Sequence, residues 1–250
     1  IVRRRSLQEF VMEIIYGINP VLEAIRSGRR PLEAVLLARE REEGGRFREI
    51  FKEAANHGVS CKFVPLKSLD RMAEGKNHQG VLAQLGLVNY EAWVNALKCP
   101  NLVLYVDRVT DCGNLGAILR SAAAFGVDWV LLSQKESAPV NDVVFRTSAG
   151  GAEYLRFARV PSALKMLRRF KEEGFLTIAA EAGCQIFDPR AAAGRRVLLL
   201  IGGEDHGVRT SLLNESDLIA SIPMSGRINS LNVSVAAGIM LNLIVNASKV

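Results

Sequence analysis

The sequence of 250 residues has few cysteines, few aromatic residues and no long uninterrupted apolar run. Its four cysteines are irregularly spaced, with no C-x-x-C pair and no histidine at ligand spacing, which argues against a zinc site or a disulfide framework and favours reduced thiols in the cytoplasm. The stretch Leu231 to Val245 is broken by Ser234, Gly238 and Asn242 and is shorter than the roughly 20 residues of a membrane span. It predicts a buried helix, and we expect neither a membrane nor a metal partner.

The N-terminus also lacks the apolar segment of a secretion signal. Arg3-Arg4-Arg5 is followed by Glu9 and Glu13, which interrupt any apolar run. Met12 is a candidate natural start, and residues 1–11 are expected to add little to the fold.

The composition is that of an ordinary globular protein. Hydrophobic residues make up 49% and charged residues 23% of the chain, which is long enough for one large or two modest domains. The formal net charge of +6 favours a polyanionic partner such as nucleic acid without proving one.

Residues 13–88 can close a small core of their own. From Ile14 to Leu87 the pattern alternates between helix and strand and begins with a helix, where Pro20 in the first turn costs no hydrogen bond. The expected elements are a helix from Asn19 to Ile25, a strand from Ala34 to Ala38, a helix from Arg46 to Asn56, a strand from Ser60 to Val64, a helix from Leu66 to Ala73 and a strand from Gln79 to Leu85.

Residues 89–100 read as a linker with one helical turn, and residues 101–250 as a second domain. Short apolar strands alternate there with helices, a pattern typical of an α/β domain with a mostly parallel sheet. The expected elements are strands at Leu102 to Val106, Trp129 to Leu132, Leu155 to Val160, Leu176 to Glu181, Val197 to Ile201 and Leu218 to Ile222, and a basic helix from Ser162 to Glu173.

Two of these strands end in loops rich in exposed backbone. Gly202-Gly203-Glu204 follows the first, at the carboxyl end where open α/β sheets bind ligands. The second is followed by the loop Pro223 to Asn229, and Ser230-Leu231-Asn232 then opens a helix. Taken separately, the glycines also fit a simple turn, Glu204 a solvated carboxylate and Ser230 an N-cap.

A third loop follows the strand that ends at Val106. It reads Asp107-Arg108-Val109-Thr110-Asp111-Cys112-Gly113-Asn114-Leu115-Gly116 and runs into a helix that contains Arg120. By spacing alone Asn114 fits an N-cap and Arg120 a solvated helix residue. A dinucleotide site is disfavoured because G-x-G-x-x-G is absent and only G-x-x-G is present.

Together, IGGEDHG, IPM, SLNVSVAAG and the N-x-G-x-x-x-R pattern at Asn114 to Arg120 resemble the SpoU/TrmH family of RNA ribose methyltransferases in the SPOUT superfamily. The resemblance implies a deep trefoil knot in the C-terminal domain, an exception to unknotted topology. It also implies S-adenosylmethionine bound mainly by main chain around Gly202, Gly203, Ile222, Met224, Ser230 and Leu231. The implied catalytic set is Arg120, Asn114, Glu204, Ser230 and Asn232.

The N-terminal part carries a second resemblance. Tyr16-Gly17-Ile18-Asn19-Pro20-Val21 and Asn77-His78-Gln79-Gly80-Val81 are similar to the substrate-binding domain of many SpoU enzymes, which is L30e/L7Ae-like. The residues 76–78 fit a polar hairpin tip as well as an RNA contact. Phosphate contacts would give salt-sensitive affinity, and the candidate RNA-binding residues are Arg29, Arg30, Lys76, Asn77 and His78.

The resemblance implies methyl transfer to a ribose 2′-hydroxyl, most like the enzymes that modify a guanosine in large-subunit (23S) ribosomal RNA. Transfer RNA and an inactive RNA-binding protein of the same fold are the alternatives. Arg120 is often assigned as the base, but a guanidinium is nearly always charged, so we expect it to hold phosphate and stabilise the developing alkoxide, oriented by Glu204 and Asn114.

A homodimer is expected through an apolar C-terminal helix, with Val233, Ala237, Met240, Leu241 and Ile244.

Overall fold

The computed structural model describes residues 12–41, 44–204 and 206–247. The chain divides into two compact units, Ile1–Val88 and Asn89–Val250. The segment 1–11 lies outside the described residues.

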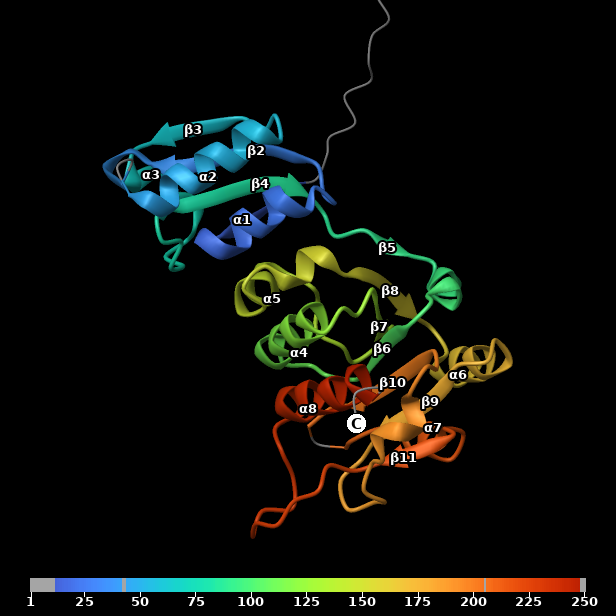
Figure 1. The fold of residues 1–250 in the computed structure, drawn as a ribbon. Coiled ribbons are helices and arrows are strands. Elements are labelled where there is room, and N and C mark those ends of the chain that lie inside the picture. Colours follow the sequence, from blue (N-terminus) through green and yellow to red (C-terminus); the bar gives the residue numbers. More distant parts are fainter. Residues whose placement is uncertain (1–11, 42–43, 205, 248–250) are drawn as a thin grey trace, which may run out of the picture. The chain divides into compact units, whose positions relative to one another are not determined.

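The first unit is a four-stranded mixed sheet with helices on both faces (Figure 1). Its strand order is β1-β4-β2-β3, in which only the β2–β3 pair is parallel. Ala34, Leu36 and Ala38 of β2 pack with Leu69 of α3 on one face of the sheet. The elements are β1 (Met12–Tyr16), α1 (Ile18–Ser27), β2 (Leu32–Ala38), α2 (Gly45–Asn56), β3 (Cys61–Val64), α3 (Leu66–Met72) and β4 (Val81–Gly86).

The order of elements expected for this unit is wrong at its start, because strand β1 precedes the first helix. Five residues with two adjacent isoleucines carry little periodicity. They become a strand because β4 pairs with them antiparallel, from Met12 opposite Gly86 to Tyr16 opposite Leu82. Tertiary pairing, rather than local pattern, defines this element.

The second unit is a seven-stranded sheet in which every pair is parallel, with strand order β11-β9-β10-β6-β7-β8-β5 (Figure 1). This confirms the expected α/β class. The elements are β5 (Tyr90–Glu91), β6 (Leu102–Asp107), α4 (Cys112–Ala124), β7 (Trp129–Ser133), α5 (Asp142–Thr147), β8 (Arg156–Val160), α6 (Ala163–Glu172), β9 (Leu176–Ala180), β10 (Val197–Gly202), α7 (Thr210–Leu213), β11 (Leu218–Ala220) and α8 (Val233–Val245).

Alternation along the central strands supplies two cores. Tyr105 and Leu200 point to the face covered by α6, where Met166 and Phe170 pack, while α4 packs against both α5 and α8. Every residue of β6, β7 and β10 is buried, as expected for strands covered on both faces. The segment 89–100 forms β5, which pairs with β8, and a short 3-10 helix at Trp93–Lys98.

Candidate active site

Three loops of the second unit are joined by the side chain of Asn114. Its Nδ2 donates a hydrogen bond to Glu204 Oε1, and its Oδ1 accepts one from Asn232 Nδ2 at 3.0 Å. Asn232 Oδ1 in turn accepts from the backbone N–H of Ser234 at 2.9 Å. The loops after β6 and β10 and the start of α8 are therefore tied together by residues from all three sequence motifs.

Helix capping places Asn114 for this role. The N-cap of α4 is Asp111, whose Oδ1 accepts from the backbone N–H of Asn114 at 2.7 Å, so the alternative of Asn114 as N-cap is wrong. In the same way Asn232, and not Ser230, caps α8. Because a residue in the first turn is not needed to cap its own helix, the Asn114 side chain is available to link the other two loops.

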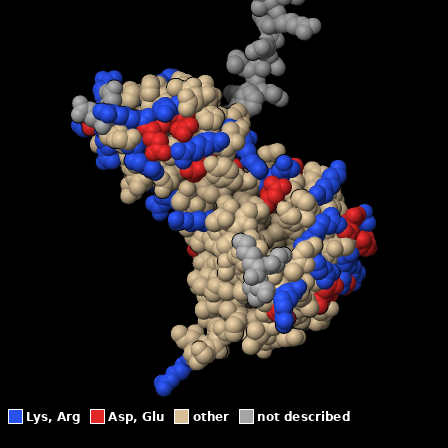
Figure 2. Space-filling model, viewed as in Figure 1, with Lys and Arg blue, Asp and Glu red and all other residues tan. Residues whose placement is uncertain are grey.

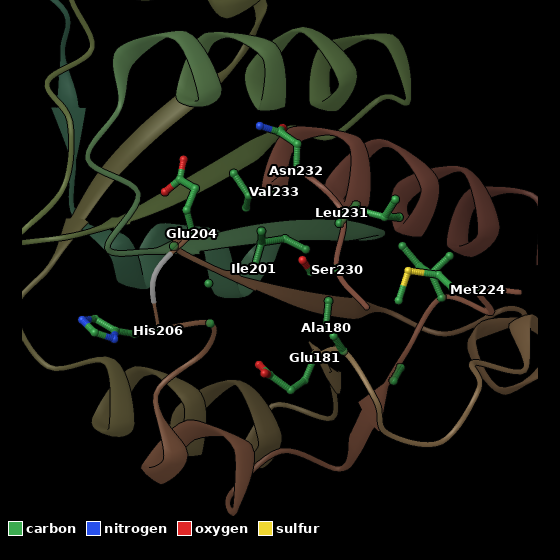
Figure 3. Close-up of a pocket in the computed structure, with 17 residues that line it drawn as sticks. Ala180, Glu181, Ile201, Glu204, His206, Met224, Ser230, Leu231, Asn232 and Val233 are labelled. Atoms are coloured by element: carbon green, nitrogen blue, oxygen red, sulfur yellow. The ribbon is translucent and has the colours of Figure 1, made fainter. Parts of the chain in front are cut away.

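Beside this network lies a pocket of about 650 Å³ at the carboxyl ends of β9, β10 and β11 (Figure 3). Apolar side chains of Ile201, Met224 and Leu231 line it together with the polar groups of Ser230 and Asn232. All six residues expected at a cofactor site line this one pocket: Gly202, Gly203, Ile222, Met224, Ser230 and Leu231.

Close backbone packing explains the glycines of the loop after β10. A Cβ atom on Gly202 would lie 1.9 Å from the carbonyl carbon of Gly207, and one on Gly203 would lie 2.4 Å from the carbonyl oxygen of Arg108. Gly203 and Gly207 form a β-bridge, and Gly207 has φ of +58°. Only glycine permits the loop to fold back on itself against the end of β6.

A buried ion pair anchors the far end of the same loop. Asp107 is completely buried, and Arg209 binds it through Nε at 3.0 Å and Nη2 at 2.5 Å. Tyr105 donates its hydroxyl to Asp107 Oδ1 at 3.0 Å, and burial together with the Asp107 charge raises the pKa of Tyr105. Hydrogen bonding to Asp107 raises the pKa of Arg209. This cluster fixes the far end of the loop to the end of β6.

Sequence reasoning missed two titratable groups of the pocket, Glu181 and His206. Glu181 follows β9, and its Oε2 accepts from the backbone N–H of Val208 at 3.3 Å. Glu181 is labelled in Figure 3 at the same pocket as Glu204. The available signal was its place at the carboxyl end of a strand, which becomes informative only when β9 is known to neighbour β10.

Arg120 is not part of this arrangement. It is exposed on α4, does not line the pocket, and makes no hydrogen bond or ion pair with Glu204 or Asn114 among the described residues. It lies six positions after Asn114, which places the two side chains about 120° apart around the helix at 100° per residue. The geometry therefore gives no support to the expectation that Glu204 and Asn114 orient Arg120.

The five candidate RNA-binding residues of the first unit divide into two groups. Arg29 and Arg30 precede β2, whereas Lys76, Asn77 and His78 precede β4, and antiparallel pairing puts these positions at opposite ends of the ladder. Its pairs run from Leu32 opposite Leu85 to Leu37 opposite Val81, a span of about 17 Å at 3.4 Å per residue.

Two of the five are buried and engaged in structural contacts. Arg30 Nη1 donates to Glu13 Oε2 at 2.8 Å, and His78 Nε2 lies 2.9 Å from Asp70 Oδ1. His78 Nδ1 accepts from the backbone N–H of Gly80 at 3.0 Å, so Nε2 carries the proton that faces Asp70. These contacts favour the structural alternative for Arg30 and His78. Arg29, Lys76 and Asn77 are exposed.

Within residues 12–41, 44–204 and 206–247, no cluster of three or more His, Cys, Asp and Glu side chains could hold a metal ion. None of the helices in that part of the chain is long and apolar enough to cross a membrane.

Comparison with known protein families gives two matches. Residues 101–242 match the SpoU rRNA Methylase family, and residues 14–91 match the family described as RNA 2′-O ribose methyltransferase substrate binding. An "Uncharacterized tRNA/rRNA methyltransferase" of Mycolicibacterium vanbaalenii is 37% identical over 238 residues, which cover 92% of this chain and 74% of that protein. A protein with the same description from Mycobacterium avium is 35% identical over 244 residues, covering 96% of this chain and 79% of that one.

Solved structures show the same fold. An AdoMet-bound rRNA methyltransferase from Sinorhizobium meliloti superposes with a TM-score of 0.74 at 23% identity, covering 93% of this chain and 86% of that one. The SpoU methyltransferase AviRb from Streptomyces viridochromogenes, also in complex with AdoMet, gives 0.73 at 24% identity, covering 93% and 89%.

Proposed function

Since the chain belongs to the SpoU rRNA methylase family, we propose that it transfers the methyl group of S-adenosylmethionine to a ribose 2′-hydroxyl of structured RNA, and that its substrate is a guanosine of large-subunit ribosomal RNA. The observation that carries the proposal is the hydrogen-bonded link from Glu204 through Asn114 to Asn232 at the rim of the 650 Å³ pocket. Transfer RNA is the second candidate substrate, because the relatives are described as tRNA/rRNA methyltransferases.

The chemistry of the pocket fits S-adenosylmethionine. Its volume of about 650 Å³ is in the usual range for a cofactor site. Among the described residues, Glu181 and Glu204 line it and no lysine or arginine does, which suits a donor with a net positive charge. Gly203 and Leu231 also line the pocket, and their backbone would contact a bound donor in the proposed arrangement.

When bound, the donor supplies a methyl group on a positively charged sulfur, which is already a good electrophile. The chain must then position the 2′-hydroxyl in line with it and favour loss of the hydroxyl proton. We propose that Asn114, Glu204 and Asn232 hold the three loops together, and that Ser230 contacts the donor or the ribose. Arg120 holds phosphate of the bound RNA and stabilises the charge that develops on the 2′-oxygen.

The direct test uses RNA from cells that lack this protein. Incubation with the purified chain and S-adenosylmethionine is expected to add ribose methylation at one guanosine of the large-subunit RNA, which mapping of 2′-O-methyl positions reads out. A synthetic fragment with 2′-deoxyguanosine at the mapped position is the control and should accept no methyl group. Methylation of a base, or none in any RNA, would contradict the proposal.

The knot expected from the resemblance belongs to this proposal. The loop 202–208, folded back against β6, and the loop before α8 line the same pocket, which is the arrangement that a knotted C-terminal segment would give.

We also propose a homodimer, with an interface made by residues other than those expected from the sequence. Val233, Ala237, Met240, Leu241 and Ile244 are buried within the chain and cannot contact a partner. Exposed apolar side chains remain on α8 and the preceding loop, with Val235 49% and Ile228 74% exposed. The surface over α4 and α8 carries few charged side chains in Figure 2, which supports the proposal of a dimer interface there.

Light scattering at micromolar concentration should therefore give twice the mass of one chain. Val235→Lys is expected to halve that mass, because a charge would be desolvated in the interface. Val94→Lys, at a residue that is 46% exposed on the 3-10 helix of the same unit, is the matched control and should leave the dimer intact. A wild-type mass of one chain would count against the dimer.

The first unit is proposed to bind RNA through phosphate contacts of Arg29 and Lys76. The slope of log affinity against log salt concentration is negative. The double variant Arg29→Gln with Lys76→Gln should reduce its magnitude by about 2, since each lost phosphate contact removes about 1. Deletion of residues 1–88 should flatten the slope further and leave donor affinity nearly unchanged. Filter-binding titrations from 50 to 200 mM salt measure the slope. An unchanged slope in the truncated chain would move RNA recognition to the second unit.

A further inference from the structure

A second, smaller pocket of about 270 Å³ adjoins the one assigned to the donor. The two share Gly203, Glu204, His206 and Gly207, so the loop after β10 separates them. The remaining lining residues are Arg108, Thr110 and Glu136. Every side chain of this pocket is polar, whereas the first pocket is partly apolar.

Topology gives this pocket a special place in the sheet. From β6 the chain proceeds to β7 and β8 on one side, whereas β10, β9 and β11 lie on the other. The loops after the neighbouring strands β6 and β10 therefore leave in opposite directions. In open α/β sheets such a switch point creates a crevice at the carboxyl ends of the strands, and ligands bind there.

Arg108 lines this pocket, and its backbone conformation fixes where its side chain begins. Its φ of +57° is uncommon for a residue other than glycine, and its backbone N–H donates to Ser133 Oγ at 3.1 Å. Asp107, 3.7 Å from Arg108 Nε, is already bound by Arg209 at 2.5 Å. Arg108 Nε is a buried donor without a hydrogen-bond acceptor in the described residues. Among the described residues, the guanidinium thus has a long ion pair with Asp107 and no hydrogen-bond acceptor for Nε.

Glu136 lies on a short loop that is fixed at both ends. Ser133 Oγ donates to the carbonyl of Lys135 at 3.0 Å, and the backbone N–H of Ala138 donates to the carbonyl of Val109 at 2.8 Å. Glu136 has φ of +55°, so this pocket contains two residues in the left-handed region. Backbone strain of this kind concentrates at ligand-binding sites, because the surrounding structure must hold it in place.

The pair of charges matches one nucleobase better than the others. An arginine donates to two neighbouring acceptors, as offered by O6 and N7 of guanine. A carboxylate accepts from two neighbouring N–H donors, and among the four bases guanine alone presents such a pair, at N1 and N2. Because an arginine and a glutamate line one pocket, guanine can satisfy both at once, with its ribose directed toward the shared loop at Gly203 and Glu204.

We propose that this second pocket receives the base of the acceptor nucleoside and selects guanine, with Arg108 donating to the O6/N7 edge and Glu136 accepting from N1–H and N2–H. The inference rests on the proposed function and adds the residues that read the base. The two pockets then place donor and acceptor on opposite sides of the loop 203–207, next to Asn114 and Glu204.

The test measures kcat/KM on an RNA fragment that carries the mapped site with either guanosine or inosine, which lacks the 2-amino group. The wild-type chain should lose about 10-fold to 100-fold with inosine. Glu136→Gln should lose a similar factor with guanosine and show little further loss with inosine. Glu172→Gln, which removes an exposed carboxylate from α6, is the matched control and should keep the wild-type preference.

Calorimetry provides the second readout. Glu136→Gln should bind S-adenosylmethionine with wild-type affinity, which shows that the fold and the donor pocket are intact. Full activity of Glu136→Gln on guanosine, or a mapped acceptor other than guanosine, would overturn the base-reading proposal and leave methyl transfer standing. Absence of any ribose methylation by the wild-type chain would overturn the proposed function and this inference with it.

Discussion

Arg120→Ala is expected to lose methyl transfer by about 100-fold or more, as for other groups that stabilise transition-state charge. Binding of S-adenosylmethionine should be unchanged, since Arg120 does not line the donor pocket. A single-turnover assay at saturating donor and RNA isolates the chemical step from binding. The residue is exposed on α4, so its removal should change the free energy of unfolding by less than about 0.5 kcal/mol.

The substitution Arg120→Lys separates charge from geometry. An ammonium is a point charge without the planar fork that holds a phosphate oxygen and the 2′-oxygen together, so the lysine variant should lose nearly as much activity as the alanine variant. If the role of Arg120 required only a positive charge, Arg120→Lys would instead keep most of the wild-type rate.

Arg195→Ala is the matched control, since Arg195 is another exposed arginine of the second unit and lines neither pocket. It should keep the wild-type rate. Near-normal activity in Arg120→Ala would remove this residue from the mechanism and support the alternative of a solvated helix residue.

Gly203→Val is expected to reduce donor affinity by at least about 100-fold, equivalent to about 3 kcal/mol. A valine side chain would clash with a donor bound against this backbone, and the structure adds a stronger cause. Any Cβ at this position would lie 2.4 Å from the carbonyl oxygen of Arg108, so the loop must leave the end of β6. Because backbone cannot yield as a side chain can, both pockets should be distorted.

Calorimetry with S-adenosylmethionine measures this loss, and far-UV circular dichroism shows whether the rest of the chain remains folded. Gly45→Val is the control, because an added Cβ there meets no atom within 4 Å. It should bind the donor normally. Unchanged donor affinity in Gly203→Val would refute the placement of the donor beside this loop.

The confirmed part of the sequence prediction rests on local patterns. Short apolar runs such as Val197 to Ile201 became strands within a residue or two of their expected limits, because a strand buried on both faces leaves a run without polar breaks. The residues of three motifs were expected to form one site, and Asn114, Glu204 and Asn232 are in hydrogen-bond contact although about 90 and 118 positions separate Asn114 from the other two.

Sequence patterns could not show which side chains form contacts within the protein and are therefore not available to a partner. Arg30 and His78 have the composition of an RNA-binding surface, yet Glu13 and Asp70 engage them within the unit. Likewise the apolar face of α8 from Val233 to Ile244 is buried inside the chain, and the exposed apolar side chains are different ones. Burial depends on neighbours from distant elements, about which the local sequence carries little information.

The sequence by itself determined the α/β class, the strands of the parallel sheet and the loops proposed to form the active site, because hydrophobic periodicity and glycine placement are local properties. Only the tertiary structure decided that β9 neighbours β10, which brings Glu181 into the pocket proposed for the donor, and that β6 neighbours β10, which opens the second pocket beside Arg108. The physical reason is that strand order depends on long-range pairing between strands and on packing between whole faces. Many different orders of the same strands would be equally compatible with the local sequence.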